Sequence, residues 1–580
     1  MYIYTFKELK QNVKKDTSSF PSIKIALLGD TATQFLATAL QGTAIERGCR
    51  LDLFEAEYNQ VERQFMDPSS EFFAVKPDYA VVFQSTHKLL SAYNKLPPEQ
   101  QAHLADERLK FVRFLTNAFA GRLIYFNYPE IDNAVFGSFA NKVENSFIWQ
   151  IRKLNYELMA LASGSSNLFI CDIAAVQNKL GRDVLFDSSI YVSTEMVLSL
   201  ESIPSIASRV MDIVCAAQGA LKKCLILDLD NTLWGGVIGD DGLENIQLGH
   251  GLGIGKAFTE FQHWIKALKT RGIIIAVCSK NNEDTAKEPF IKHPEMVLKL
   301  EDISVFVANW DNKADNIRHI QSILNIGFDS MVFLDDNPAE RAIVRENIPG
   351  ITVPELPEDP ADYLEYCYGL NLFETASYSA EDAERTKQYQ VEAERASLQK
   401  TFANEADFLK SLDMVSEVTG FDAFNIPRVA QLSQRSNQFN LRTVRYTEAD
   451  AARLAADSRY EPFSFTLEDK FGDNGLICVV ILEKQDTETL FIDTWFMSCR
   501  VLKRGMENFT LNTIVNYAQK SGFKRIIGEY IATTKNKMVE GHYPGLGFTA
   551  VVDEERKLFV LDVDTYTDKE CFIKTRGKGA

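Results

Sequence analysis

The 580-residue chain lacks several features that would assign it to a class directly. It has no uncharged stretch of about 18 residues and no apolar segment suited to a signal peptide, so we expect no membrane span and a cytoplasmic location. Its nine cysteines show neither a Cys-x-x-Cys pair nor a Cys/His zinc spacing, which predicts free thiols and no structural metal. The net charge of −18 leaves no basic excess for a phosphate backbone, which argues against general nucleic-acid binding.

Apolar sequence, by contrast, is plentiful. Hydrophobic residues make up 46% of the chain, enough for several packed cores. On a domain size of about 150 residues, the length predicts roughly three to four domains. The composition therefore indicates a multidomain enzyme and not a disordered scaffold.

The most informative segment is ILDLDNTLWGGVIGDDG, at residues 226–242. The aliphatic run 224–229 predicts a buried strand, with Asp228 and Asp230 near its carboxyl end, where open α/β sheets bind ligands. Because residues i and i+2 of a strand point to the same side, one carboxylate can attack a substrate while the other moves protons. Taken alone, Asp-x-Asp is equally consistent with a strand-end turn, since Asp and Asn favour turns.

Three later segments supply the other parts of a phosphoryl-transfer site. IIIAVCSKNN predicts a second strand ending in Ser279, a hydroxyl suited to a phosphate oxygen. Lys313, in ANWDNKADN, is a cation able to pair with both phosphate and nucleophile. MVFLDDNPAER predicts a third strand ending in Asp335 and Asp336, a carboxylate pair suited to Mg²⁺.

The order strand-Asp, strand-Ser, Lys, strand-Asp-Asp resembles the four motifs of the haloacid dehalogenase (HAD) superfamily of phosphohydrolases. The resemblance implies that Asp228 is the nucleophile and Asp230 the general acid/base. It implies a phosphate-binding role for three further residues, Thr232, Ser279 and Lys313.

The same resemblance implies a Mg²⁺ site. Its ligands would be the Asp228 carboxylate, the Asp230 backbone carbonyl and one acid of the last motif, with Asp336 favoured over Asp335. Residues 234–242 are too few for a cap domain, and their glycines predict a flap hairpin. Such an open site would admit a macromolecular substrate.

The flanking sequences LWGGVIGDDG, VCSKNN, NWDNKADNI and FLDDNPAER resemble the FkbH-like branch of the superfamily. That resemblance implies transfer of the glyceryl unit of 1,3-bisphosphoglycerate to an acyl carrier protein, with removal of its remaining phosphate. In this scheme an enzyme cysteine first holds the glyceryl group, and the SCR sequence around Cys499 resembles the family's cysteine motif. Arg500 and a predicted helix terminus would favour the Cys499 thiolate. A buried core thiol is the alternative, and Cys278 is the competing cysteine.

Residues 1–218 alternate predicted strands, at 23–28, 79–83 and 123–126, with helices such as 139–162, which predicts a parallel sheet. LLGDTATQFL resembles the first block of SGNH-type hydrolases, but Thr31 stands where those enzymes have serine. FNYPE around Asn127 resembles a later block, yet the terminal Asp-x-x-His is missing around Asp187. We therefore expect a non-catalytic binding or dimerisation domain.

The carboxyl-terminal region resembles the GNAT acyltransferase fold. Runs 476–482 and 489–496 predict paired antiparallel strands that lead into an amphipathic helix. In the Arg-x-x-Gly-x-Gly loop that binds pyrophosphate in that fold, Arg500 and Gly505 match, but Lys503 replaces the first glycine. This replacement weakens the case for coenzyme A and leaves two candidate ligands, coenzyme A and a carrier's phosphopantetheine arm.

Docking an acidic carrier protein requires a local basic patch on this acidic chain. The residues expected to contact the carrier or its pantetheine arm are Arg500, Lys503, Arg504, Gly505, Asn536 and Tyr543. His542 is a possible base for the thiol, although a lone His is more often a loop residue.

The expected architecture is α/β and multidomain. It comprises an SGNH-like α/β domain at 1–218, a HAD-like Rossmannoid parallel sheet at 219–375, a helical linker at 376–400 and a GNAT-like α+β domain at 401–580. Two other functions stay open: a Mg²⁺-dependent phosphatase of a small phosphorylated metabolite, and a GNAT-type acyltransferase with a HAD binding module.

Overall fold

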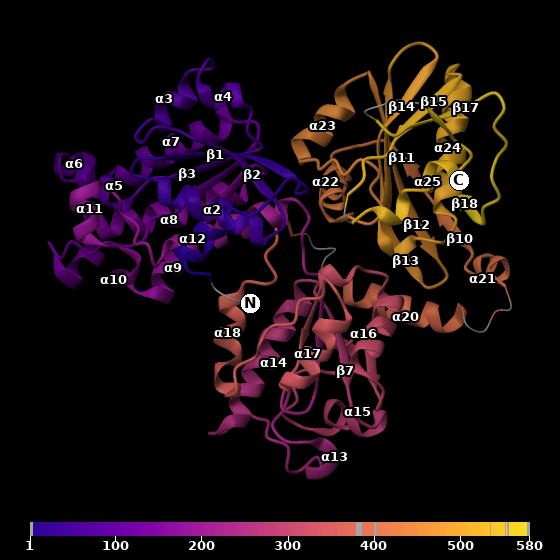
Figure 1. Ribbon diagram of the computed structural model, residues 1–580, viewed down its shortest axis with the longest axis horizontal. Helices are drawn as coiled ribbons and strands as arrows, with labels where there is room; N and C mark the ends of the chain where they lie inside the picture. The colour runs from indigo at the N-terminus through magenta and orange to yellow at the C-terminus, as the bar shows by residue number, and fades with distance from the viewer. Residues whose placement is uncertain are drawn as a thin grey trace. The chain divides into compact units, whose positions relative to one another are not determined.

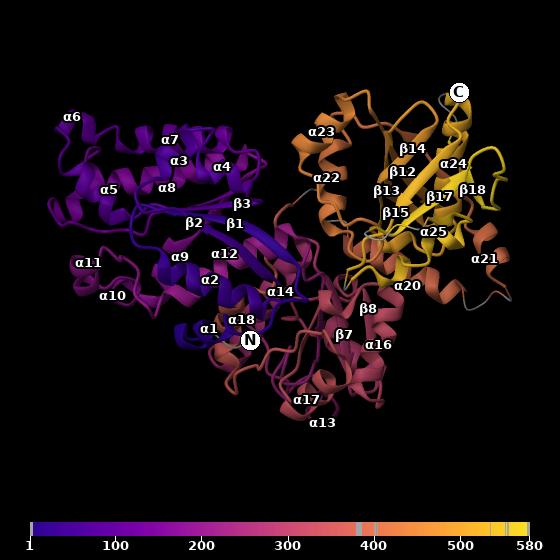
Figure 2. The same cartoon turned by 45° about the horizontal axis from the view of Figure 1, so that its top comes forward.

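The computed structural model describes residues 4–378, 385–399, 402, 404–533, 535–551, 553 and 556–576. Its contacts divide the chain into a unit of residues 2–217 and a unit of residues 218–580, and each is described by itself (Figures 1 and 2). Within the described ranges, no helix combines the length and apolar character that crossing a membrane requires.

The first unit is built on a five-stranded parallel sheet. Its strands, in spatial order, are β2 (Arg50–Glu55), β1 (Ser22–Gly29), β3 (Tyr79–Phe83), β4 (Arg122–Phe126) and β5 (Leu168–Cys171). Helices cover both faces, as a parallel sheet requires (Figure 2). One layer contains α7 (Leu104–Ala118) and α8 (Phe147–Ser163), and the other contains α2 (Gln34–Glu46) and α12 (Ile203–Ala217).

The parallel sheet predicted for this unit is confirmed, but the helix predicted at 139–162 is not continuous. A 3₁₀ segment, η1 (Gly137–Lys142), precedes α8. The Ser146 hydroxyl accepts a hydrogen bond from the amide of Trp149 and caps α8, so the α-helix begins only at Phe147.

The second unit contains a four-stranded parallel sheet in the order β8 (Val305–Ala308), β7 (Ile274–Ser279), β6 (Cys224–Leu227) and β9 (Met331–Leu334). Successive side chains of β6 point to opposite faces. Leu225 and Leu227 pack in the core beneath α14 (Ile254–Thr270) and α18 (Tyr363–Leu370). Cys224 and Ile226 pack beneath α16 (Lys313–Leu324) and α17 (Pro338–Asn347). This double burial explains the unbroken aliphatic run of β6.

A nine-stranded mixed sheet forms the rest of this unit. Its main path is β16 (Thr549–Val551), β17 (Leu558–Asp562), β15 (Arg525–Glu529), β14 (Thr489–Met497), β13 (Gly472–Lys484), β12 (Tyr460–Asp469), β10 (Met414–Ser416) and β18 (Ile573–Thr575), while β11 (Val418–Thr419) pairs with β12. The antiparallel pair β13 and β14 and the following helix α24 (Met506–Ser521) confirm those predicted elements. With three sheets and covering helices, the predicted α/β multidomain fold class is confirmed.

The linker between the two sheets of this unit includes helix α20 (Arg385–Gln399). Helix α20 contacts α16 and is tied to the carboxyl-terminal sheet by buried charges. Arg395 Nη2 of α20 lies 2.8 Å from the carboxylate of Asp469, and Arg504 binds both Asp469 and Glu392 of α20. Since both arginines and Asp469 are buried, these ion pairs fix α20 against the sheet.

Candidate active site

Asp228 follows β6 at the carboxyl edge of the four-stranded sheet and faces a buried lysine. Lys313 Nζ lies 2.9 Å from Asp228 Oδ2 and 2.5 Å from Asp335 Oδ2, and its side chain is 3% exposed. Burial acts to lower the pKa of Lys313, but the charges of the two carboxylates outweigh it and raise that pKa above its ordinary value. The lysine is therefore a fixed positive charge beside Asp228.

Three carboxylates at this edge can converge on one cation. Asp228, Asp335 and Asp336 each offer one oxygen, and these oxygens lie within 4.8 Å of one another. Burial and the charge of Asp228 raise the pKa of Asp335 to about 7, against the opposing charge of Lys313. Such a cluster of hard oxygen ligands fits a cation such as Mg²⁺.

The two acids of the last motif have different partners. Asp335 accepts hydrogen bonds from Lys313 and from the amide of Asn337 at 2.9 Å. No other described residue donates a hydrogen bond to the carboxylate of Asp336. Arg341, which the sequence analysis did not single out, donates to the carbonyls of Asp335 and Asp336 at 2.8 and 2.7 Å and is itself buried. Arg341 thus holds the loop while the carboxylate of Asp336 stays available.

Asp230 is held by three hydrogen bonds. Trp234 Nε1 and the amide of Ile238 donate to its Oδ1, both at 3.0 Å, and Asn281 Nδ2 donates to its Oδ2 at 3.1 Å. Burial raises the pKa of Asp230, although the donors from Ile238 and Trp234 act against the rise. A fixed carboxyl with a raised pKa suits a proton donor. Asn281 was missed by the sequence analysis, although it lies in the quoted VCSKNN motif.

The two hydroxyls of the motifs also lie at this edge. Thr232 is fully buried, and its Oγ1 accepts a hydrogen bond from the amide of Asp336 at 3.2 Å, which links the first and last motifs. Ser279 ends β7, and Val277 pairs with Leu227 in the register, so Ser279 stands level with the residue after Asp228.

A flap follows Asp230, as predicted, but it is longer than residues 234–242. Gly235 and Gln247 form an antiparallel bridge with backbone hydrogen bonds of 3.0 and 2.8 Å, and a short helix, α13 (Ile238–Asp241), lies between them. We refer to Asp228, Asp230, Lys313, Asp335 and Asp336 as the Asp228 centre.

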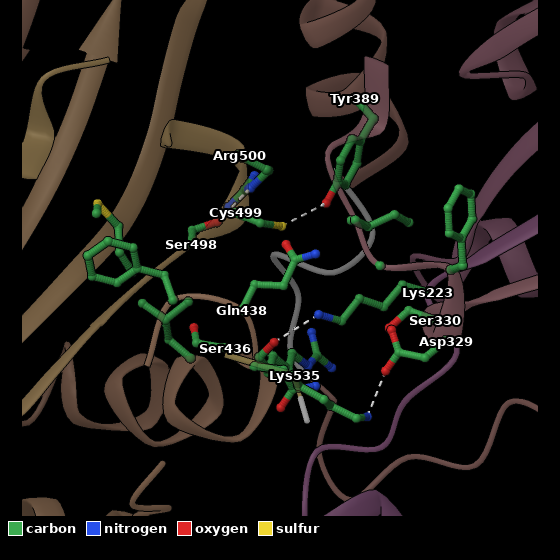
Figure 3. A pocket seen from close by; sticks show the side chains of 18 of the residues that line it. Lys223, Asp329, Ser330, Tyr389, Ser436, Gln438, Ser498, Cys499, Arg500 and Lys535 are labelled. Carbon is green, nitrogen blue, oxygen red and sulfur yellow. Dashed lines mark hydrogen bonds and ion pairs between the residues drawn. The ribbon is translucent and has the colours of Figure 1, made fainter. Parts of the chain in front are cut away.

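Whereas Asp228 lies at the carboxyl end of β6, Cys499 follows β14 and lies near the amino ends of β6 and β9. It begins a 3₁₀ segment, η5 (Cys499–Val501), and its carbonyl accepts a hydrogen bond from Asn325 Nδ2 at 2.8 Å. Its thiol is half-buried, and its Sγ lies 3.9 Å from the hydroxyl of Tyr389 (Figure 3).

The thiol opens onto a cavity of about 430 Å³, referred to below as the Cys499 cavity. Lys223, just before β6, and Ser330, just before β9, belong to its wall. At about 3.3 Å per residue, the backbone from Lys223 to Asp228 spans roughly 16 Å. The structure therefore does not bring Cys499 and Asp228 together.

The other candidate bases and thiols have different surroundings. Cys278 is fully buried, and burial raises its pKa. His542 packs edge-on against Phe439 and Trp495, and burial lowers its pKa to about 3, so it stays neutral. No contact between His542 and Cys499 is seen.

The expected basic docking patch is largely absent from the surface. Arg504 is 5% exposed and binds Glu392 and Asp469, and Arg500 is 8% exposed and binds Gln388. Because α20 lies over them, only Lys503 of the three is exposed, so the expectation of a surface patch is wrong for both arginines.

The remaining residues of that expectation lie inside the fold. Asn536 is fully buried and donates to the carbonyls of Asn440 and Ile531, both at 2.9 Å. Tyr543 is 1% exposed. Gly505 caps α24 with a φ of 79°, a left-handed conformation that favours glycine.

In the first unit, three of the positions that resemble SGNH blocks have hydrogen-bond partners, and the fourth, Thr31, has a buried hydroxyl with no partner among the described residues. Both oxygens of Asp30 accept from the amide of Ser85, at 2.9 and 3.0 Å. Thr31 is fully buried, Asn127 donates to Asp172 at 2.7 Å, and Asp187 caps α11 (Ser188–Thr194). The contacts of Asp30, Asn127 and Asp187 hold neighbouring backbone or side-chain groups in place.

Comparison with known proteins shows which family the chain resembles. Residues 24–215 match the model of the FkbH N-terminal domain. The crystal structure of the N-terminal part of the protein BF1531 from Bacteroides fragilis, which contains a phosphatase domain and is complexed with Mg, is 65% identical. That match covers 65% of this chain and 100% of that chain, with a TM-score of 0.64.

Two further solved structures are much less similar. The ribosomal-protein-S18-alanine N-acetyltransferase from Escherichia coli is 13% identical, covering 27% of this chain and 99% of that chain, with a TM-score of 0.21. The GNAT domain of PAT from S. lividans is 13% identical, covering 25% and 89%, with a TM-score of 0.21. Similarities this low say nothing about function.

No curated protein matches the chain significantly. The assignment therefore depends on the FkbH N-terminal domain and on the 65% identity to the whole of the solved part of BF1531. By these two matches, the chain belongs to the FkbH-like family of the HAD superfamily.

Proposed function

We propose that the chain is a Mg²⁺-dependent phosphatase combined with a glyceryl transferase. It takes the glyceryl unit of 1,3-bisphosphoglycerate, removes the remaining phosphate at the Asp228 centre and loads the acyl group on the thiol of an acyl carrier protein's phosphopantetheine arm. The observation that carries the phosphatase part is the pairing of Lys313 with both Asp228 and Asp335. Family membership supports the transferase part.

In the phosphatase step, Asp228 attacks the phosphorus atom of the phosphate ester. The new Oδ–P bond forms as the ester O–P bond breaks, and Asp230 gives its proton to the departing oxygen. Asp230, now ionised, takes a proton from the water that hydrolyses the aspartyl-phosphate. The raised pKa of Asp230, caused mainly by burial, keeps that proton available for the first half of the cycle.

Two groups balance the charge of the phosphate. Lys313 is one, since its ammonium already lies 2.9 Å from Asp228. Asp228, Asp335 and Asp336 would hold the Mg²⁺, which supplies positive charge to the phosphate oxygens when bound. The backbone carbonyl of Asp230 would complete the set expected for the family.

In the transfer step, the Cys499 thiolate attacks the acyl carbon of the acyl phosphate. A C–S bond forms, the C–O bond to phosphate breaks, and inorganic phosphate leaves with the electron pair and the former thiol proton. The carrier thiol then attacks the same carbon and releases Cys499. The half-buried thiol beside a cavity supports this role.

Intact-protein mass spectrometry after incubation with Mg²⁺ and freshly generated 1,3-bisphosphoglycerate tests both parts. We expect an acyl adduct on the wild type and on Asp228→Asn but none on Cys499→Ala. When an acyl carrier protein is added, we expect the carrier-bound product to keep its phosphate only with Asp228→Asn. Phosphate release without any adduct would favour a phosphatase of a small metabolite. A carrier-bound product with the same phosphate content from the wild type and from Asp228→Asn would favour an acyltransferase with a HAD binding module.

A further inference from the structure

The Cys499 cavity differs in charge from the rest of the chain. The chain as a whole carries a net charge of −18, yet the described residues that line this cavity include many cations and one acid. The cations are Lys223, Arg428, Arg435, Arg500 and Lys535, and the acid is Asp329. A concave site lined mainly by one sign of charge concentrates ligands of the opposite sign.

Some of the contacts of these cations are with neutral acceptors. Lys223 Nζ donates to the backbone carbonyl of Arg435 at 2.8 Å, and Arg500 donates to the neutral side chains of Gln388 and Ser498. Hydrogen bonds to neutral acceptors orient a cation without cancelling its charge. Figure 3 shows Lys223, Arg500 and the Cys499 thiol around the same space.

One ion pair among the lining residues is partly exposed. Lys535 Nζ is 2.7 Å from Asp329 Oδ2, and their side chains are 36% and 42% exposed. An exposed pair of this kind contributes little to stability. It can therefore be altered with little risk to the fold, and its two members have opposite effects on an anion in the cavity.

Two polar atoms in the wall have no hydrogen-bond partner among the described residues. They are Ser436 Oγ and Gln438 Oε1, and the Ser436 side chain is buried. Leaving a buried polar group without a hydrogen bond is unfavourable, so such groups normally have a partner. A hydroxyl can donate to a phosphate oxygen, and an amide oxygen can accept from the hydroxyl of a small polyol acid.

From these contacts we infer that the Cys499 cavity binds a small acyl compound that carries a phosphate group, and that Lys223 and Lys535 select for that phosphate. The acyl carbon faces Cys499, and Ser436 and Gln438 complete the polar contacts. The cavity volume of about 430 Å³ is that of a small-ligand site. The inference depends on the proposed function, to which it adds the residues that recognise a phosphorylated donor.

The test measures how fast iodoacetamide alkylates Cys499 in the full-length Asp228→Asn chain with Mg²⁺ removed, so that no phosphate is hydrolysed. The probe is 3-phosphoglycerate, and glycerate is the matched ligand without phosphate. We expect 3-phosphoglycerate to slow alkylation about tenfold at a concentration at which glycerate has no effect, a difference of about 1.4 kcal/mol in binding.

Variants of Lys223 and of the pair Lys535–Asp329 give the direction of the charge effect. Lys535→Gln and Lys223→Gln should each lose most of the protection, whereas Asp329→Asn should keep or increase it. Lys557→Gln is the matched control, because Lys557 is an exposed lysine of the same unit that pairs with Glu540 and does not line the cavity. It should leave protection unchanged.

Three results would overturn the inference. Glycerate could protect Cys499 as well as 3-phosphoglycerate does, or Lys557→Gln could lose as much protection as Lys535→Gln. In the third, 4′-phosphopantetheine protects Cys499 and 3-phosphoglycerate does not. Its failure is distinct from failure of the proposed function. If 1,3-bisphosphoglycerate acylates Cys499 equally well in wild type and Lys535→Gln, only the phosphate assignment is wrong. If 3-phosphoglycerate protects Cys499 but no cysteine is ever acylated, the phosphate-binding site is supported and the proposed transferase function is wrong.

Discussion

Asp30 and Asp228 occupy the same place in two different parallel sheets, and only one has the surroundings of a nucleophile. Each follows the first strand of its sheet in the sequence. Both oxygens of Asp30 accept from the Ser85 amide, whereas Asp228 faces Lys313 at 2.9 Å with Asp335 close by. The position after a strand thus supplies a carboxylate, and neighbouring loops decide whether it reacts or holds the backbone.

The largest expected effect separates these two aspartates directly. Asp228→Asn should lower phosphatase turnover by roughly 10⁴-fold, because it removes the proposed nucleophile. Asp30→Asn should leave turnover unchanged, since Asp30 belongs to the other unit's sheet. Steady-state phosphate release from a generic aryl phosphate with Mg²⁺ measures the turnover of both variants. Equal losses of turnover in the two variants would contradict the difference between Asp30 and Asp228.

Lys313→Met tests whether the acids of the Asp228 centre depend on one buried charge. The variant leaves Asp228 and Asp335 facing each other without a cation, which should lower the free energy of unfolding by about 3–5 kcal/mol. Urea denaturation without and with Mg²⁺ measures this loss. We expect added Mg²⁺ to restore part of it, and a variant as stable as the wild type without Mg²⁺ would contradict the pairing.

Asp30 should make the first unit less stable as the pH rises. Burial raises its pKa from 3.8 to about 6, so the folded state holds the proton more tightly than the unfolded state. Its contribution is fully present below about pH 4 and is lost as the pH rises through about 6, a change of about 3 kcal/mol.

Hydrogen–deuterium exchange of peptides from β1 in urea, corrected for intrinsic exchange, measures this dependence. In Asp30→Asn the slope between about pH 4 and pH 6 should disappear, because the amide does not titrate. A slope that survives the substitution would assign the pH dependence to another group.

The smallest expected effect distinguishes the two acids of the last motif. Asp336→Asn should weaken Mg²⁺ binding by about tenfold with little change in stability, since no other described side chain pairs with that carboxylate. Asp335→Asn should instead lower stability, because Lys313 loses one of its two acids. Calorimetric Mg²⁺ titration and urea denaturation of both variants measure these two effects. Equal Mg²⁺ affinity and equal stability of the two variants would contradict different roles for Asp335 and Asp336.

Most of the Asp228 centre is predictable from sequence because its parts are local. An aliphatic run buried on both faces predicts a strand, and a carboxylate directly after it must lie at the carboxyl edge of a parallel sheet. Asn281 and Arg341 escape such reasoning because their roles depend on hydrogen bonds to another motif or to backbone carbonyls. The type of a residue does not indicate which group will be its hydrogen-bond partner in the fold.

The surroundings of Cys499 are less predictable because they depend on distant segments. Arg504 looks like part of a surface patch in sequence, but Glu392 lies 112 residues away and neutralises it in the fold. Likewise, Cys499 follows a strand of the nine-stranded sheet but packs against residues of the four-stranded sheet. No local sequence pattern indicates such a contact between distant segments.

The placement of Cys499 and Asp228 at opposite ends of β6 has a consequence for side reactions. A phosphatase must activate water, and a thioester is readily destroyed by activated water. In the proposed function, roughly 16 Å of strand between Lys223 and Asp228 would keep the carboxylate that deprotonates water away from an acyl group held on the thiol. The sheet would then act as a barrier that protects the thioester from hydrolysis until the carrier receives the acyl group.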